Sequence, residues 1–130
     1  AQAYDFITTK EKGFDEPISE GGSNVSGGQK QRLSIARALV RKSEIYIFDD
    51  SFSALDFKTD AILRKALKKE TKDAIVLIVA QRIGSIMDAD KIIVLDEGKV
   101  VGVGKHKELL STCNVYHEIA LSQLTEEELA

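Results

Sequence analysis

The sequence predicts an α/β fold that contains parallel strands and ends in an antiparallel hairpin. Two short apolar runs, residues 45–48 and 74–80, have the composition of β-strands that are buried on both faces. The segment between them, residues 59–69, repeats its apolar side chains at helical spacing. A strand, a helix and a second strand in this order predict a crossover and therefore a parallel sheet.

The N-terminal third predicts a helix end, a loop and a second helix. Residues 1–11 have a helix-compatible pattern, which Gly13 and Pro17 then interrupt. Residues 16–28 are rich in Gly, Ser, Glu and Asn, a composition that favours turns and exposed backbone. Residues 29–41 place apolar side chains at helical spacing with basic residues between them. We therefore expect an amphipathic helix that a glycine pair opens.

The C-terminal third predicts a hairpin followed by two helices. Apolar residues 92–95 and 100–103 flank Asp96-Glu97-Gly98-Lys99, which has the chemistry of a hairpin turn. We expect this antiparallel pair to end the sheet. Residues 105–110 and 115–124 are helical in pattern, and the acidic tail that follows is expected to fray.

Length and composition exclude several classes of protein. A chain of 130 residues with 43% hydrophobic and 30% charged residues suits one modest globular domain, or a piece of one. The net charge of −3 argues against a general nucleic-acid or anionic-membrane binder. The lone Cys113 cannot form an internal disulfide, which favours a reducing compartment. No apolar stretch approaches the roughly 18 residues of a spanning helix, and an acidic N-terminus is not a signal peptide. We therefore expect the chain to be soluble.

A candidate phosphate-binding segment lies where the second predicted helix begins. In Ser26-Gly27-Gly28, a hydroxyl, exposed backbone N–H groups and the positive end of a helix converge on one point. Most glycine pairs before helices are only flexible entries, so this triplet by itself is weak evidence. Its context is more specific. Asn24-Val25-Ser26-Gly27-Gly28-Gln29, then Gln31-Arg32 and Ala36-Arg37-Ala38-Leu39, resembles the signature motif and signature helix of ATP-binding-cassette (ABC) ATPases.

Two further motifs follow in the order and spacing of that family. The predicted strand ends in Asp49, which resembles the Walker B aspartate, and Ser53-Ala54-Leu55-Asp56 resembles the D-loop. The resemblance implies a partial P-loop NTPase core with part of the helical subdomain. Residues 1–42 would be the end of the helical subdomain with the signature helix, residues 43–124 the C-terminal part of the ATPase core, and residues 125–130 a tail.

The resemblance also implies roles for individual residues. In this family ATP lies between two domains that face head to tail, so Ser26, Gly27, Gly28 and Gln29 would contact the γ-phosphate of ATP held by a partner domain. Asp49 would hold Mg²⁺, a cation that suits a carboxylate at a strand end. Ser53 and Asp56 would lie along the dimer interface. The competing interpretations are a solvated carboxylate for Asp49 and a plain helix cap for Asp56.

Two positions depart from the family pattern. Active members have a glutamate after the Walker B aspartate, where this chain has Asp50, and a histidine where it has Gln81. Aspartate is one methylene shorter, and general-base catalysis tolerates little misplacement. Glutamine forms hydrogen bonds but does not titrate. Together with an intact signature, these changes resemble the degenerate-site half of a heterodimeric ABC exporter, in which the partner performs the efficient hydrolysis.

Three other residues receive weaker assignments. Glu20 matches the last acidic residue of the exporter X-loop, which lies near the coupling helices of the transmembrane domain, although residues 16–17 depart from that pattern. Its alternative is a solvated loop carboxylate. His106 falls in a structural stretch common in exporter domains and does not replace the missing histidine, and His117 is expected on the surface of the last helix.

The Walker A pattern Gly-x-x-x-x-Gly-Lys-[Ser/Thr] does not occur in these 130 residues. The resemblance therefore covers the second part of the domain, and we expect a partial domain that neither binds ATP tightly nor hydrolyses it alone. Apolar surface that normally faces the missing strands would be exposed, which favours association or domain swapping.

The resulting prediction is the ATP-binding, ATP-hydrolysing subunit of an ABC exporter at the cytoplasmic face of the cell membrane, with ATP and Mg²⁺ as cofactors and no nucleic-acid partner. Two alternatives remain from other classes. One is an ABC ATPase of the chromosome-maintenance or DNA-repair kind, which long heptads before the signature would favour. The other is a non-enzymatic interaction module that uses the degenerate fold as a docking surface.

Overall fold

A computed structural model of the chain describes residues 1–125. The chain forms two compact units, of which the first is Ala1–Val79 and the second begins at Ala80. The predicted division into residues 1–42 and 43–124 follows family architecture and stays a prediction. The predicted frayed tail, residues 126–128, lies outside the described residues.

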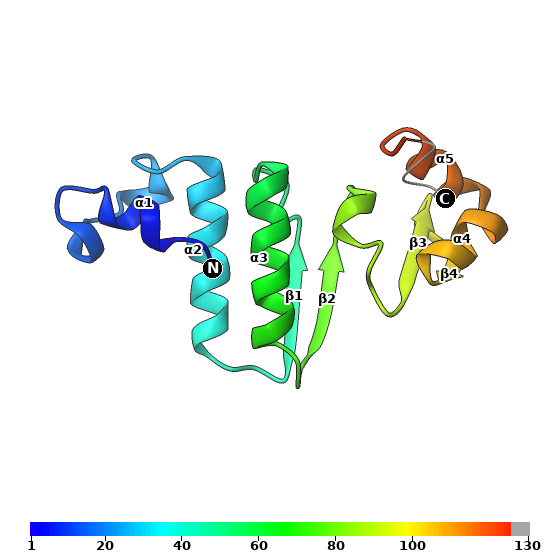
Figure 1. Ribbon diagram of the computed structural model, residues 1–130, viewed down its shortest axis with the longest axis horizontal. Coiled ribbons are helices and arrows are strands. Elements are labelled where there is room, and N and C mark those ends of the chain that lie inside the picture. The colour runs from blue at the N-terminus through cyan, green and yellow to red at the C-terminus, as the bar shows by residue number, and fades with distance from the viewer. Residues whose placement is uncertain (126–130) are drawn as a thin grey trace. The chain divides into compact units, whose positions relative to one another are not determined.

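The first unit confirms the predicted order of helix end, loop, helix, strand, helix and strand (Figure 1). The second helix begins at Gly27, two residues before its predicted start, because Ser26 already caps it. The elements of this unit are α1 (Tyr4–Thr8), the 3₁₀ turns η1 (Gly13–Asp15) and η2 (Glu20–Gly22), α2 (Gly27–Val40), β1 (Ile45–Asp49), α3 (Phe57–Glu70) and β2 (Ile75–Val79).

The two strands of this unit form the predicted parallel pair, in register from Ile45 opposite Ile75 to Asp49 opposite Val79. Their predicted burial on both faces is wrong for the described residues. Burial along β1 alternates, with Phe48 only 3% exposed and Ile47 67% exposed. Side chains of α2 and α3 pack on one face of the pair alone, so the opposite face leaves apolar side chains at the surface. The buried cluster on the covered face consists of Ile35, Tyr46, Phe48, Phe52, Leu55, Leu63 and Leu67.

The second unit confirms the predicted hairpin and the two helices after it. Glu97 and Gly98 have φ values of 47° and 74°, the left-handed pair that a two-residue type I′ turn requires. The elements of this unit are η3 (Ile83–Ser85), β3 (Ile92–Asp96), β4 (Lys99–Gly104), α4 (His106–Thr112) and α5 (Asn114–Leu121).

The hairpin does not end the first sheet, contrary to the prediction. In the described part of the chain, β3 and β4 hydrogen-bond to each other as a separate two-stranded sheet. The chain between β2 and β3 forms turns and η3, and β3 takes its ladder hydrogen bonds from β4. The second buried cluster covers one face of this hairpin and consists of Ile83, Ile92, Val94, Leu109, Cys113, Tyr116 and Ala120.

A buried polar contact joins the two C-terminal helices. The His106 Nδ1 atom lies 2.8 Å from the Tyr116 hydroxyl, and both side chains are buried. Burial also raises the pKa of the Tyr116 phenol. His106 thus has a structural role, and His117 is exposed, as predicted. Across residues 1–125, every helix is too short or too polar to cross a bilayer.

Candidate functional site

Three element ends gather at one end of the first unit: the start of α2, the end of β1 and the start of α3 (Figure 1). This arrangement brings the signature motif to the other two motifs, which follow it about 20 to 30 residues later in the sequence. Ser26 to Gly28 begin α2, Asp49 ends β1, and residues 53–56 connect β1 to α3. The candidate site is therefore a surface composed of a helix N-terminus, a strand-end carboxylate and a turn.

The start of α2 is held by a reciprocal cap. The Ser26 Oγ atom accepts a hydrogen bond from the Gln29 backbone N–H at 3.3 Å, and Gln29 Oε1 accepts one from the Ser26 N–H at 3.0 Å. The N–H groups of Gly27 and Gly28 lie in the first helical turn, where no intrahelical acceptor exists. With the positive end of the helix behind them, these donors suit an anion such as a phosphate.

Gly28 is needed because another part of the backbone lies against it. A Cβ atom at Gly28 would lie 2.9 Å from the Ala54 carbonyl oxygen, a distance that real Cβ contacts essentially never show. At Gly27 the nearest atom to such a Cβ would be the Ala54 methyl carbon, at an ordinary 3.5 Å. The second glycine of the signature therefore allows the turn after β1 to pack against the start of α2.

Two adjacent carboxylates lie at the end of β1. Asp49 is the last residue of the strand, and both Asp49 and Asp50 are exposed. Asp50 adopts a left-handed conformation with φ of 47°, which aspartate tolerates better than most residues. Its N–H donates to the Val79 carbonyl at 3.1 Å, which ties the turn to the end of β2.

Asp49 and Asp50 could bind Mg²⁺ only together with ligands from outside the protein. Within residues 1–125, no group of three or more His, Cys, Asp or Glu side chains could hold a metal ion. Mg²⁺ commonly keeps several waters and binds one or two carboxylates together with substrate phosphates. Asp49 fits this role as a single ligand, with the remaining ligands supplied by water and nucleotide.

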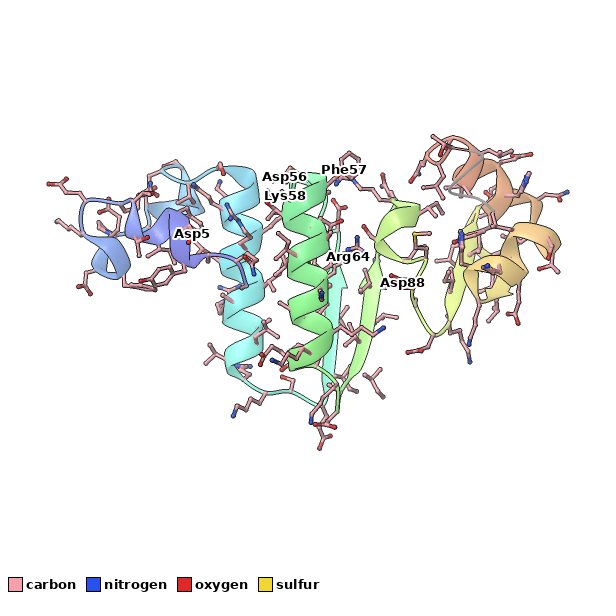
Figure 2. The ribbon with its side chains drawn as sticks, viewed as in Figure 1. Asp5, Asp56, Phe57, Lys58, Arg64 and Asp88 are labelled. Atoms are coloured by element: carbon pink, nitrogen blue, oxygen red, sulfur yellow. The ribbon has the colours of Figure 1, made fainter. Side chains whose placement is uncertain are left out.

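Asp56 caps α3, as its alternative interpretation predicted. Its Oδ1 atom accepts the Thr59 backbone N–H at 2.9 Å, and its Oδ2 atom accepts the Thr59 hydroxyl at 2.7 Å. These two hydrogen bonds, the backbone one first, hold the pKa of the carboxyl below its ordinary value of 3.8. Figure 2 shows Asp56 at the first turn of α3, at the same end of the unit as the start of α2. A D-loop role for Asp56 stays a prediction and is compatible with the cap.

Two further predicted residues belong to other segments of the chain. Gln81 belongs to the second unit, where its carbonyl accepts a hydrogen bond from the Gln123 amide at 2.8 Å. Its position relative to Asp50 stays a prediction. Glu20 is exposed at the start of η2, in a loop that Asn24 holds by hydrogen bonds to Pro17 and Ser19.

Sequence reasoning assigned no role to Gln31. Its amide group reaches from the second turn of α2 to the turn after β1, where it contacts three residues. The only sequence signal was the place of Gln31 beside the signature motif, because a polar residue in the second turn of an amphipathic helix has no periodic or capping pattern of its own.

Comparison with known proteins identifies the family. The model of the ABC transporter family matches residues 1–53. An uncharacterized ABC transporter ATP-binding protein of Mycobacterium tuberculosis is 48% identical over 123 residues, which is 95% of this chain and 21% of the relative. The α-hemolysin translocation ATP-binding protein HlyB of Escherichia coli is 46% identical over 111 residues, 85% of this chain and 16% of the relative.

A solved structure agrees with the sequence relatives. A bacterial Atm1-family ABC exporter with ATP bound superposes with a TM-score of 0.86 at 35% identity, covering 94% of this chain and 21% of that one. The chain is therefore part of an ABC transporter ATPase domain, homologous to the ATP-binding proteins of ABC exporters. It spans about a fifth of the length of these relatives.

Proposed function

We propose that this chain belongs to the ATP-binding subunit of an ABC exporter, which hydrolyses ATP to move a substrate across a membrane. The observation that supports this most directly is the surface where the signature start of α2, Asp49 and the D-loop turn meet. The named relatives support it further, since HlyB is a translocation protein and the structural relative is an exporter. Transport relatives favour this function over the chromosome-maintenance alternative. As in such exporters, the domain would work on the cytoplasmic side, beside a transmembrane domain.

The start of α2 would complete an ATP site on a partner domain. Ser26 to Gln29 form a helix start that is exposed at Ser26 and Gly27 and half-buried at Gly28 and Gln29, with donors suited to a γ-phosphate. Backbone N–H groups fixed by a cap need no reorganisation when charge shifts during phosphoryl transfer. The Ser53 to Asp56 turn packs against this start, so the interface loop and the phosphate site would approach the partner together.

The chain's own nucleotide site would hydrolyse ATP slowly. Asp49 would help to hold Mg²⁺, and the bound ion would supply positive charge that offsets the charge of the phosphates. Asp50 and Gln81 would be the catalytic residues, and both are weaker than the glutamate and histidine of active members. The domain would therefore pair with a different, catalytically competent ABC domain in a heterodimer, and Glu20 would face the coupling helices of the transmembrane domain.

The proposal can be tested with the full-length protein reconstituted with its partner domain. Vanadate trapping of a photoreactive ATP analogue then measures ATP hydrolysis on each subunit separately. Restoring the family residues, Asp50→Glu with Gln81→His, should raise trapping on this subunit about tenfold, since each change restores a positioned proton-transfer group. The matched control Asp50→Asn should not raise it.

Unchanged trapping on this subunit in the restored variant would contradict the degenerate-site proposal. A full-length protein without any ATP hydrolysis, in which Asp49→Asn also changes nothing, would contradict the ATPase proposal itself. Asp49→Asn is expected to abolish hydrolysis at this subunit's site, because an amide is a much weaker Mg²⁺ ligand than a carboxylate.

A further inference from the structure

One side chain joins the signature helix to the turn after the Walker B strand. Gln31 Nε2 donates to the Asp50 carbonyl and to the Ser53 hydroxyl, each at 3.0 Å. Gln31 Oε1 accepts the Ala54 backbone N–H, also at 3.0 Å. Both ends of the amide are used, so the donor and the acceptor of one side chain bind the two ends of the same five-residue turn.

The Gln31 contacts add to hydrogen bonds that the turn forms within itself. It begins with Asp50 in the left-handed region, where a residue other than glycine is uncommon. Inside the turn, the Ser53 hydroxyl donates to the Asp50 carbonyl at 3.1 Å, and the Ser53 N–H does so at a long 3.5 Å. The Gln31 amide adds a second donor to the Asp50 carbonyl and the acceptor for Ala54.

The same helix face provides a second contact with this turn. Gly28 and Gln31 are three residues apart on α2 and therefore lie on one face of the helix. Gly28 meets the Ala54 carbonyl, and Gln31 accepts from the Ala54 N–H, so both polar backbone groups of Ala54 face the start of α2. A steric contact and a hydrogen bond thus fix the distance between the helix start and the turn.

We propose that Gln31 is a positioning residue for ATP hydrolysis, whose amide holds the turn of residues 50–54 against the start of α2. The phosphate-facing N–H groups of Gly27 and Gly28 and the D-loop then keep one relative position as the two ABC domains close on ATP. This inference rests on the proposed function. It assigns Gln31 no contact with nucleotide.

The experiment is steady-state ATP hydrolysis by the full-length protein with its partner domain. Gln31→Met keeps the length of the side chain and removes all three hydrogen bonds. It is expected to lower kcat about tenfold and to change KM for ATP less than about twofold, because misplacement acts in the transition state more than on binding. The control is Ser34→Ala, an exposed position on the same helix, which should change neither.

A double-mutant cycle with Ser53 separates positioning from general damage. Ser53→Ala removes one partner of the Gln31 amide, so the kcat losses of Gln31→Met and Ser53→Ala should not add. Combining Gln31→Met with Ser34→Ala should give the same kcat loss as Gln31→Met alone. Rates are expressed per folded molecule, counted from the monodisperse fraction in size-exclusion chromatography.

Three outcomes would overturn the inference. One is Gln31→Met with wild-type kcat per folded molecule and only a lower melting temperature, which would show a purely structural role. Another is a rise in KM with unchanged kcat. If the unmutated protein hydrolyses ATP, these two outcomes contradict the role of Gln31 but not the proposed function. Absence of hydrolysis in the unmutated protein would overturn both.

Discussion

The two units of the chain are built alike and use their glycines differently. Each has a two-stranded sheet with helices packed on one face, and its buried cluster combines aromatic and aliphatic side chains. In the first unit, Gly28 lies against a backbone carbonyl, which cannot move without moving the turn. In the second, Gly102 and Gly104 lie closest to side-chain atoms of Cys113 and Glu108. The close approach of Gly28 to a backbone carbonyl thus belongs to the candidate site, whereas Gly102 and Gly104 allow the hairpin to pack against helix side chains.

The units also differ in where they place polar side chains. The first unit exposes Asp49 and Asp50 at a strand end, free for solvent or a ligand to reach. The second buries His106 and Tyr116 together, where each satisfies the other. Substitutions of the two exposed carboxylates should therefore change activity first, and those of the buried His106–Tyr116 pair should change stability first.

The largest expected effect is that of Gly28→Ala in the full-length protein. The added methyl group would lie 2.9 Å from the Ala54 carbonyl oxygen, so the helix start and the turn must separate. Displacement of about 1 Å at a reacting site costs roughly 100-fold in rate. We expect a loss of ATP hydrolysis of that order.

The matched control for this prediction is Gly84→Ala in the second unit, where a Cβ would meet no atom within 4 Å. It should leave hydrolysis unchanged. Equal losses in both variants, measured as kcat at saturating ATP, would remove the distinction between the two units.

An intermediate effect is expected for Tyr116→Phe. The ring still fills its site, but His106 Nδ1 loses its partner in a buried position. Leaving a buried polar group without a hydrogen bond costs about 1–3 kcal/mol. The free energy of unfolding of the chain, measured by urea denaturation, should fall by that amount.

Tyr4→Phe provides the same chemical change in the first unit, at a side chain that is 67% exposed. It should change the free energy of unfolding by less than about 0.5 kcal/mol. A Tyr116→Phe variant as stable as the Tyr4→Phe variant would show that the buried pair contributes nothing to the second unit.

The smallest effect concerns Asp56 and pH. Its pKa in the folded chain is below 3.8, so the folded state favours the carboxylate more than the unfolded state does. The stability that this charge contributes is fully present above pH 3.8 and is lost as pH falls through the folded-state pKa. Asp56→Asn should therefore flatten the fall in melting temperature over that acid range.

Thr59→Val tests the cause of this pH dependence, because it removes the hydroxyl that donates to Asp56 Oδ2 and keeps the backbone donor. The acid-range slope of this variant should lie between those of the wild type and Asp56→Asn. Identical slopes in all three proteins would show that the cap carries no charge-dependent stability.

Much of the fold was predictable because its signals are local. The apolar runs, the helical spacing of residues 59–69 and the Glu97-Gly98 turn each depend on a few neighbouring residues, and all are confirmed. Burial on both faces of β1 was not confirmed, because composition shows only that a side chain tolerates burial. Which face is covered depends on the helices that pack there.

The candidate site also combines features that the local sequence predicts with contacts between distant segments. From the sequence alone, the signature, Asp49 and the D-loop turn could be identified by motif, and Asp56 had the chemistry of a helix cap. The caps of α2 and α3 act over three residues, so their contacts follow from the local chain. The Gln31 contacts span 19 to 23 residues, and the Gly28 contact with Ala54 spans a similar separation.

The sequence by itself therefore determined the family, the order of the elements and the Asp56 cap at the start of α3. Only the tertiary structure decided that Gln31 binds both ends of the turn after Asp50 and that Gly28 faces a backbone carbonyl. The physical reason is that hydrogen bonds between distant segments depend on how α2 and the turn pack together, and no local propensity encodes that distance.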